Sequence, residues 1–183
     1  MRSLKWLGIL LMAIGCGCLV AVGIAMVEAA SFQSRAGQAL DDTLNARTPG
    51  SIVDDLGDGP VGRLEIPRLN VSVIVVEGED DATLARAVGH VPGTALPWEP
   101  GNTVMAGHRD TFFRPLKNLR EGDQIRMTTP RGTFEYRVSS TKIVEPDDLS
   151  VLAPTSARSL TLVTCYPFVY VGRAPKRFIV HAQ

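Results

Sequence analysis

One uncharged apolar stretch near the N-terminus restricts this chain more than any other feature. Residues 7–27 read LGILLMAIGCGCLVAVGIAMV and contain no charged side chain. About 20 apolar residues in a helix cross a hydrocarbon core of roughly 30 Å. Arg2 and Lys5 precede the stretch, and Trp6 stands where an interfacial aromatic residue is common. The sequence therefore predicts one transmembrane helix within residues 1–27, with a cytoplasmic N-terminus and the remaining chain outside the membrane.

Two alternatives to a retained anchor stay open. A cleaved signal peptide has an apolar region of about 7–15 residues before a small-residue cleavage site. The apolar run here is longer, and VEAAS at its end is a mediocre cleavage site, so we favour the anchor. A lipoprotein signal around Cys16 is the weaker alternative, because the apolar run continues well past that residue.

The composition of the chain limits its partners. The 183 residues, 45% of them hydrophobic, suit one ordinary domain and an appendage. The formal net charge is zero, which argues against a nucleic-acid partner. Cys16 and Cys18 are in the apolar stretch, far from Cys165, and no Cys–His cluster has metal-ligand spacing. We expect no disulfide, no metal site and no cofactor.

The chain after the apolar stretch divides into two regions. Residues 28–60 are polar and rich in Asp, Gly and small residues, which predicts an extracytoplasmic linker with a short helix near residues 36–44. Residues 61–183 show seven or eight short strand-like runs with turns and brief helices between them. Such a pattern predicts a mainly β domain, a single closed barrel or a sandwich.

Cys165 is the cysteine outside the apolar stretch, at the end of the strand-like run TLVTC. A cysteine is a good nucleophile when it is held as a thiolate beside a cationic group, and acyl transfer also needs an oxyanion donor. His108 ends the predicted strand NTVMAG, where a loop can project it. Arg177 begins the predicted strand RFIVHA, which can lie antiparallel to the cysteine strand. His90, in the loop GHVPG, and His181, near the C-terminus, are weaker candidates.

Spacing argues against two other cysteine chemistries. A cysteine phosphatase needs a tight phosphate loop with Cys and Arg six positions apart, whereas Arg173 is eight positions after Cys165. A papain-like enzyme has its cysteine early and its histidine late, and here His108 comes first. The non-enzymatic alternative is a membrane-tethered β-domain that binds an envelope partner, with Cys165 as a core residue.

Three segments together resemble the sortases, the cysteine transpeptidases of bacterial envelopes. TLVTC is similar to the TLxTC signature, MAGHRDTFFRPL to the strand with the catalytic histidine, and APKRFIV to the strand with the arginine. GHRDTFF together with TCYPFVYVG is most similar to class D sortases. The resemblance covers residues 61–183 and implies a sortase-like closed β-barrel. L,D-transpeptidases carry His and Cys in one short Gly-containing motif, which this chain lacks.

The resemblance implies a role for each matching residue. Cys165 attacks a peptide carbonyl in an LPxTG-like sorting motif of a surface protein, His108 moves the proton, and Arg177 stabilises the oxyanion. The acceptor is an amine of a peptidoglycan precursor or a pilin lysine. The implied location is the bacterial cell membrane, with a single span and an extracytoplasmic catalytic domain.

Three further features fit more loosely. Thr164, just before the nucleophile, is a candidate for substrate binding, with a strand-filling role as the alternative. Asp110 shares a face with His108 if the segment is extended, and is then a candidate to orient the imidazole. The acidic segment EGEDDA, residues 77–82, resembles the calcium-binding region of some sortases, but we favour a helix N-terminus there.

Overall fold

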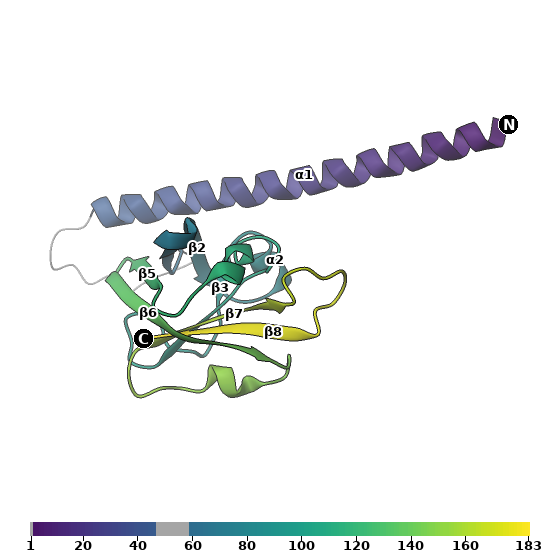
Figure 1. Ribbon diagram of the computed structural model, residues 1–183. Helices are drawn as coiled ribbons and strands as arrows, with labels where there is room; N and C mark the ends of the chain where they lie inside the picture. Colours follow the sequence, from purple (N-terminus) through teal and green to yellow (C-terminus); the bar gives the residue numbers. More distant parts are fainter. Residues whose placement is uncertain (1, 47–58) are drawn as a thin grey trace.

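The structure is a computed structural model that describes residues 2–46 and 59–183. It consists of one long N-terminal helix and a closed β-barrel that lies against the C-terminal half of that helix (Figure 1). The N-terminal half of the helix projects beyond the barrel.

Helix α1 runs without a break over Arg2–Asn45, which at 1.5 Å per residue corresponds to about 66 Å. Its apolar N-terminal side chains are exposed, and the helix is long and apolar enough to cross a membrane. The structure differs from the linker predicted at residues 28–60. Residues 28–45 continue α1, so the helix in this region is longer than the short one expected at residues 36–44. The rest of that linker, residues 47–58, lies outside the described residues.

The extension of α1 follows from local composition and from docking. Residues 28–45 are rich in Ala, Gln and Leu, which favour helix, and contain no Pro. Leu40 is buried against the barrel, and Arg63 of the barrel forms an ion pair with Asp41 at 3.0 Å. A sequence pattern with one buried leucine gives little sign of such packing, which is why this segment resembled a linker.

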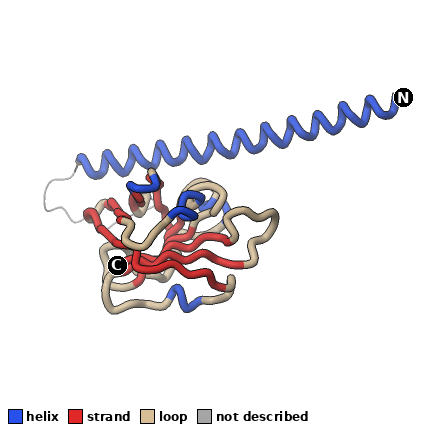
Figure 2. The backbone as a smooth tube through the Cα atoms, viewed as in Figure 1, coloured by secondary structure: helices blue, strands red, loops and turns tan. Residues whose placement is uncertain are grey.

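Eight strands form the barrel, which agrees with the seven or eight predicted strands. They are β1 (Gly62–Ile66), β2 (Val71–Glu77), β3 (Val88–His90), β4 (Asn102–Ala106), β5 (Gln124–Thr129), β6 (Gly132–Val144), β7 (Ser159–Tyr166) and β8 (Lys176–Ala182). Figure 2 shows that strands and loops make up nearly all of this domain.

The strand order is β1-β2-β3-β4-β7-β8-β6-β5, and the pairing of β5 with β1 closes the barrel. Two pairs are parallel, β2 with β3 and β4 with β7, and the others are antiparallel. Strand β7 therefore lies between a parallel neighbour, β4, and an antiparallel neighbour, β8. As a result, the C-terminal ends of β4 and β7 and the N-terminal end of β8 meet at one end of the barrel.

Four short helices connect the strands. They are α2 (Asp81–Leu84) and the 3-10 helices η1 (Pro67–Leu69), η2 (Arg114–Asn118) and η3 (Leu149–Leu152). Asp80 caps α2 by accepting from the backbone N–H groups of residues 82 and 83, and Asp148 caps η3. The Asp80 cap confirms the helix N-terminus that the sequence predicted in the acidic segment at residues 77–82.

Alternation along β7 and β8 separates a core face from an outer face. Leu160 and Leu162 of β7, and Val180 and Ala182 of β8, belong to the barrel core. Successive side chains in a strand point to opposite sides of the sheet. The residues between these positions, and Cys165 beyond them, consequently lie on the outer face of the barrel wall.

Candidate active site

Cys165 and Arg177 are direct partners in the antiparallel pairing of β7 and β8. Opposite residues in such a pair have Cβ atoms about 5 Å apart and share one face of the sheet. Cys165 is a free, half-buried thiol on the outer face. The structure therefore brings this arginine beside the cysteine, as the hairpin-like spacing of the sequence suggested.

His108 follows β4 on the same outer face. The pairing of β4 with β7 continues past Ala106, because the Gly107 N–H donates to the Val163 carbonyl at 3.1 Å. Gly107 faces inward, where an added Cβ would stand 2.8 Å from the buried Phe113 ring. The alternation then places His108 on the outer face, two positions after Ala106. Three separate segments thus carry Cys165, His108 and Arg177 to one end of the barrel.

Thr164 supports the start of this histidine segment. Its side chain is buried, and its Oγ1 donates to the Gly107 carbonyl at 2.7 Å. The hydroxyl proton is thus committed to the backbone residue just before His108. The structure places Thr164 behind the site rather than on its outer face.

Asp110 is not brought to the imidazole. Residues 109–113 form a turn, in which the N–H groups of Thr111 and Phe113 donate to the His108 carbonyl. The expected extended segment is therefore absent here, and Asp110 is 72% exposed. Within the described part of the chain, its ion pair is with Arg109, at 3.4 Å between Nε and Oδ1, and it has no bond to His108.

Arg109 is a site residue that sequence reasoning missed. It is 6% exposed, although arginine is seldom fully buried. One guanidinium nitrogen donates to the Pro167 carbonyl at 2.9 Å, and the other to the Tyr170 carbonyl at 2.9 Å. Arg109 therefore ties the turn after His108 to the loop that joins Cys165 and Arg177. Its position directly after a candidate histidine was the signal available in the sequence.

Among the residues that the structure describes, the Arg177 guanidinium hydrogen-bonds to backbone carbonyls at the start of β8 and in the loop just before it. It donates to the Lys176 carbonyl at 3.1 Å and to the Ala174 carbonyl at 3.4 Å, and it is half-buried. Arg173, the alternative arginine, is exposed in the same loop. Weak contacts of this kind leave the donors of Arg177 available to an incoming carbonyl.

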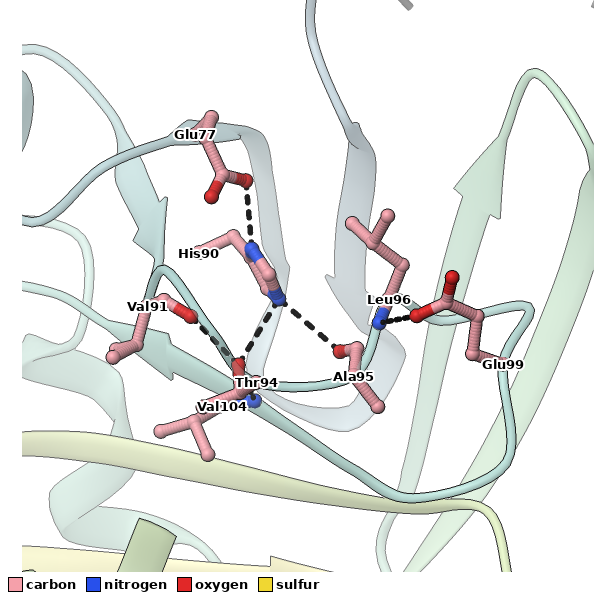
Figure 3. Close-up of polar contacts among 8 residues, drawn as sticks. All are labelled: Glu77, His90, Val91, Thr94, Ala95, Leu96, Glu99 and Val104. Atoms are coloured by element: carbon pink, nitrogen blue, oxygen red, sulfur yellow. Dashed lines mark hydrogen bonds and ion pairs between the residues drawn. The ribbon is translucent and has the colours of Figure 1, made fainter. Parts of the chain in front are cut away.

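His90 has a structural role and lies at the end of β3 rather than in the predicted loop. Its buried ring bridges Glu77, at 2.7 Å from Nδ1 to Oε2, and the Ala95 carbonyl, at 3.1 Å from Nε2 (Figure 3). The Thr94 hydroxyl lies 3.1 Å from the same Nε2. This network fixes the loop between β3 and β4, and His90 contributes to the fold rather than to the site around Cys165.

His181 lies at the opposite end of β8 from Arg177. Its Nδ1 is 3.1 Å from Oγ1 of Thr161, and that hydroxyl donates to Oδ1 of Asn102 at 2.8 Å. Burial, and to a smaller extent the positive charge of Lys142, hold the pKa of His181 below its ordinary value. A neutral, hydrogen-bonded histidine in this place stabilises the barrel.

The acidic segment at residues 77–82 does not form a cation site in the structure. Asp80 accepts hydrogen bonds from α2, and Glu77 bonds His90. Among residues 2–46 and 59–183, no group of three His, Cys, Asp or Glu side chains is arranged to hold a metal ion. The expectation that no metal or cofactor takes part stays a prediction.

Comparisons with known proteins identify the family of this chain. The sortase domain family matches residues 64–183. Sortase D of Bacillus subtilis (strain 168) is 41% identical over 144 residues, which cover 78% of this chain and 72% of that protein. Sortase A of Listeria monocytogenes serovar 1/2a (strain ATCC BAA-679 / EGD-e) is 30% identical over 112 residues, covering 59% of this chain and 50% of that protein.

A solved structure of a Clostridium perfringens Sortase D5 transpeptidase has a TM-score of 0.72 and 25% identity, and the match covers 84% of this chain and 98% of that one. The chain belongs to the sortase family and is a sortase-type cysteine transpeptidase. The matches to Sortase D and Sortase D5 confirm the predicted similarity to class D sortases. Family membership decides against the non-enzymatic β-domain.

Proposed function

We propose that this sortase is held in the bacterial cell membrane by α1 and cleaves an LPxTG-like sorting motif of surface proteins. It then joins the cleaved protein to an amine of the cell envelope, on a peptidoglycan precursor or a pilin lysine. The observation that supports this best is the pairing of Cys165 with Arg177, beside the segment that carries His108. Thioacyl transfer requires a nucleophile, a proton carrier and an oxyanion donor, and these three side chains can supply them.

In the first step, the thiolate of Cys165 attacks the carbonyl carbon of the scissile peptide bond. Arg177 exchanges its loop carbonyls for the developing oxyanion, which a guanidinium stabilises by charge-assisted hydrogen bonds. The C–N bond breaks, and His108 donates a proton to the departing amine. The products are a thioester on Cys165 and a free amine.

In the second step, an acceptor amine attacks the thioester. His108 takes the proton that this amine loses, and the C–S bond breaks to regenerate the Cys165 thiolate. A new amide bond replaces the original one, and water in place of the amine gives slow hydrolysis. We expect no metal or cofactor, since the nucleophile, the proton and the oxyanion donor all come from the chain.

Two supporting residues have other roles than the sequence suggested. We assign Thr164 to holding the backbone before His108, because its buried hydroxyl is committed to Gly107. Asp110 pairs with Arg109 in the turn and is too exposed to orient an imidazole in a dry setting. The charges of Arg2 and Lys5 favour a cytoplasmic N-terminus and an extracytoplasmic barrel.

The test is acylation of the full chain in detergent micelles. The protein is incubated with a library of LPxTG-like peptides, and its intact mass is followed over time. We expect one adduct with the mass of the acyl half of a peptide, mapped to Cys165 by digestion, and no adduct on the Cys165→Ala variant. An adduct on another residue, or no adduct from any peptide, would contradict the proposal.

A further inference from the structure

Helix α1 and the barrel are joined by specific contacts. The Gln33 side chain donates to the Arg86 carbonyl and accepts from the Ile74 N–H, both at 2.8 Å. Leu40 is buried in the same interface. The Arg86 guanidinium also stands 4.7 Å from the centre of the Phe32 ring. Such contacts on successive turns set the orientation and the height of the barrel along the helix.

Because of these contacts, one part of the barrel lies beside the outer turns of the apolar run at residues 7–27. A pocket of about 450 Å³ separates the outer turns of that run from the barrel, with lining side chains from both. The lining includes Val22, Ala25 and Met26 of α1, and Ala85, Thr111 and Phe112 of the barrel. Thr111 and Phe112 belong to the turn that begins at His108. The catalytic end of the barrel is therefore the end that lies beside the outer turns of the predicted span.

The loop between β7 and β8 extends further in the same direction. Figure 1 shows it at the end of the barrel that points toward the N-terminal half of α1. Arg109 ties this loop to the turn after His108, through the carbonyls of Pro167 and Tyr170. At the tip, Val169 is 92% exposed and Val171 is 98% exposed. The two valines therefore present aliphatic surface to the solvent at the tip of this loop.

We propose that this tip, Val169, Tyr170 and Val171 with Arg173, rests in the interface of the lipid bilayer and holds the catalytic end against the membrane. The chemistry of the tip suits that place: aliphatic side chains enter the acyl boundary, a tyrosine prefers the headgroup level, and an exposed arginine is attracted to anionic lipid. A modest tilt of α1 accommodates both the span and the loop. The inference rests on the proposed membrane anchor.

The contact has a consequence for substrate choice. Cys165 and Arg177 flank the loop at its two ends, so both lie close to the membrane surface. A polypeptide that is still tethered in the bilayer presents its first extracytoplasmic residues at that level. The enzyme then favours membrane-tethered substrates over the same motif on a protein free in solution.

Depth-dependent quenching tests the contact with the full chain. Trp6→Phe with Trp98→Phe is the background, because these are the two tryptophans of the sequence. Val171→Trp is compared with Leu149→Trp in vesicles of phosphatidylcholine and phosphatidylglycerol with brominated acyl chains. Leu149 is 70% exposed in η3. Figure 1 shows this short light-green helix on the side of the barrel away from α1. We expect quenching at Val171→Trp to exceed that at Leu149→Trp by at least about twofold. Equal quenching at the two positions would overturn the proposal.

A second variant keeps the proposal testable if tryptophan disturbs the loop. Val169→Asp with Val171→Asp should lower the rate on a membrane-tethered substrate about tenfold, since charge is expelled from the interface. The rate on a soluble peptide in detergent should stay within about twofold, because neither valine belongs to the catalytic group. Equal loss on both substrates would argue for direct peptide contact instead. If Cys165 is acylated in detergent but brominated lipid does not quench Val171→Trp more than Leu149→Trp, this inference is wrong and the proposed function stands.

Discussion

The two ends of strands β4, β7 and β8 differ in how their polar side chains are satisfied. At one end, Thr161 bonds both Asn102 and His181, and the Asn102 amide also donates to backbone carbonyls of residues 151 and 153. At the other end, the side chains of Cys165 and His108 make no hydrogen bond within the described residues. The same three strands thus support a closed network at one end and an open set of reactive groups at the other.

The contrast teaches how to separate a structural histidine from a catalytic one. His90 and His181 both have ring partners inside the protein. His108 lies on the outer face, with its backbone held by the following turn and by Gly107. A satisfied network stabilises the fold, whereas groups that await a substrate gain their partners only during the reaction. Substitutions at the two ends should therefore separate activity from stability.

The largest effect is expected at the open end. Cys165→Ala should abolish transpeptidation, because the thiolate is the atom that forms the acyl-enzyme. The fold should be unchanged, because the side chain is half-buried on the outer face and makes no hydrogen bond among the residues described. Product formation and thermal unfolding are measured together, with Cys16→Ala and Cys18→Ala as fully active controls. Product from the Cys165→Ala variant would refute the mechanism.

Variants of Arg109 test whether this buried arginine holds the open end, the end of the barrel with Cys165 and His108, in its arrangement. Arg109→Ala leaves two loop carbonyls without their donor, so the loop between Cys165 and Arg177 should loosen and kcat should fall about 10–100-fold. KM should change less, and Arg109→Lys should recover part of the kcat.

The matched control is Arg114→Ala, since Arg114 is exposed in η2 nearby. A role limited to folding would lower the melting temperature and leave the kcat of the folded enzyme unchanged. That outcome would remove Arg109 from the positioning of the site.

At the closed end, Thr161→Val should affect stability and leave activity alone. The change removes the hydroxyl that joins Asn102 and His181, and an unsatisfied buried polar group costs about 1–3 kcal/mol. Urea unfolding measures the loss. Thr133→Val, at an exposed position of β6, should stay within about 0.5 kcal/mol of the parent. A fall in kcat for Thr161→Val would mean that the two ends are coupled.

The smallest effect concerns pH. The folded protein lowers the pKa of His181, mainly by burial, so it disfavours the protonated ring. The unfolded chain binds this proton below about pH 6.5, and the contribution of His181 to stability is lost as the pH falls from that value. Between pH 7.5 and pH 5, the free energy of unfolding should therefore fall less for His181→Asn than for the parent. Identical slopes for parent and variant would contradict the assignment.

Local patterns of the sequence predicted most of the barrel and part of the site. Strand-like runs between turns identified the strands, and the acidic segment at residues 77–82 identified the start of α2. The sequence indicated that the strand of Arg177 can lie antiparallel to that of Cys165, and the structure adds the register that pairs the two residues. The predicted features depend on neighbours in the sequence, which is why they are readable without a structure.

Long-range contacts account for what the sequence did not predict. The docking of α1 depends on Gln33, whose two partners are 41 and 53 residues away. Arg109 resembles a surface arginine until the loop at residues 167–172 folds over it. Asp110 was a candidate partner of His108 only if the segment was extended, and composition does not distinguish an extended segment from a turn there. In each case the decisive partner is remote in the sequence.

The central claim is that Arg177, by its register with Cys165, is the oxyanion donor of the open end. The direct measurement compares kcat for Arg177→Ala and Arg173→Ala with one LPxTG-like peptide, after both variants are shown to fold. Loss of an oxyanion donor should lower kcat for Arg177→Ala by about 10²–10³-fold, and Arg173→Ala should stay within about threefold of the parent. A large loss at Arg173 with little change at Arg177 would contradict the account.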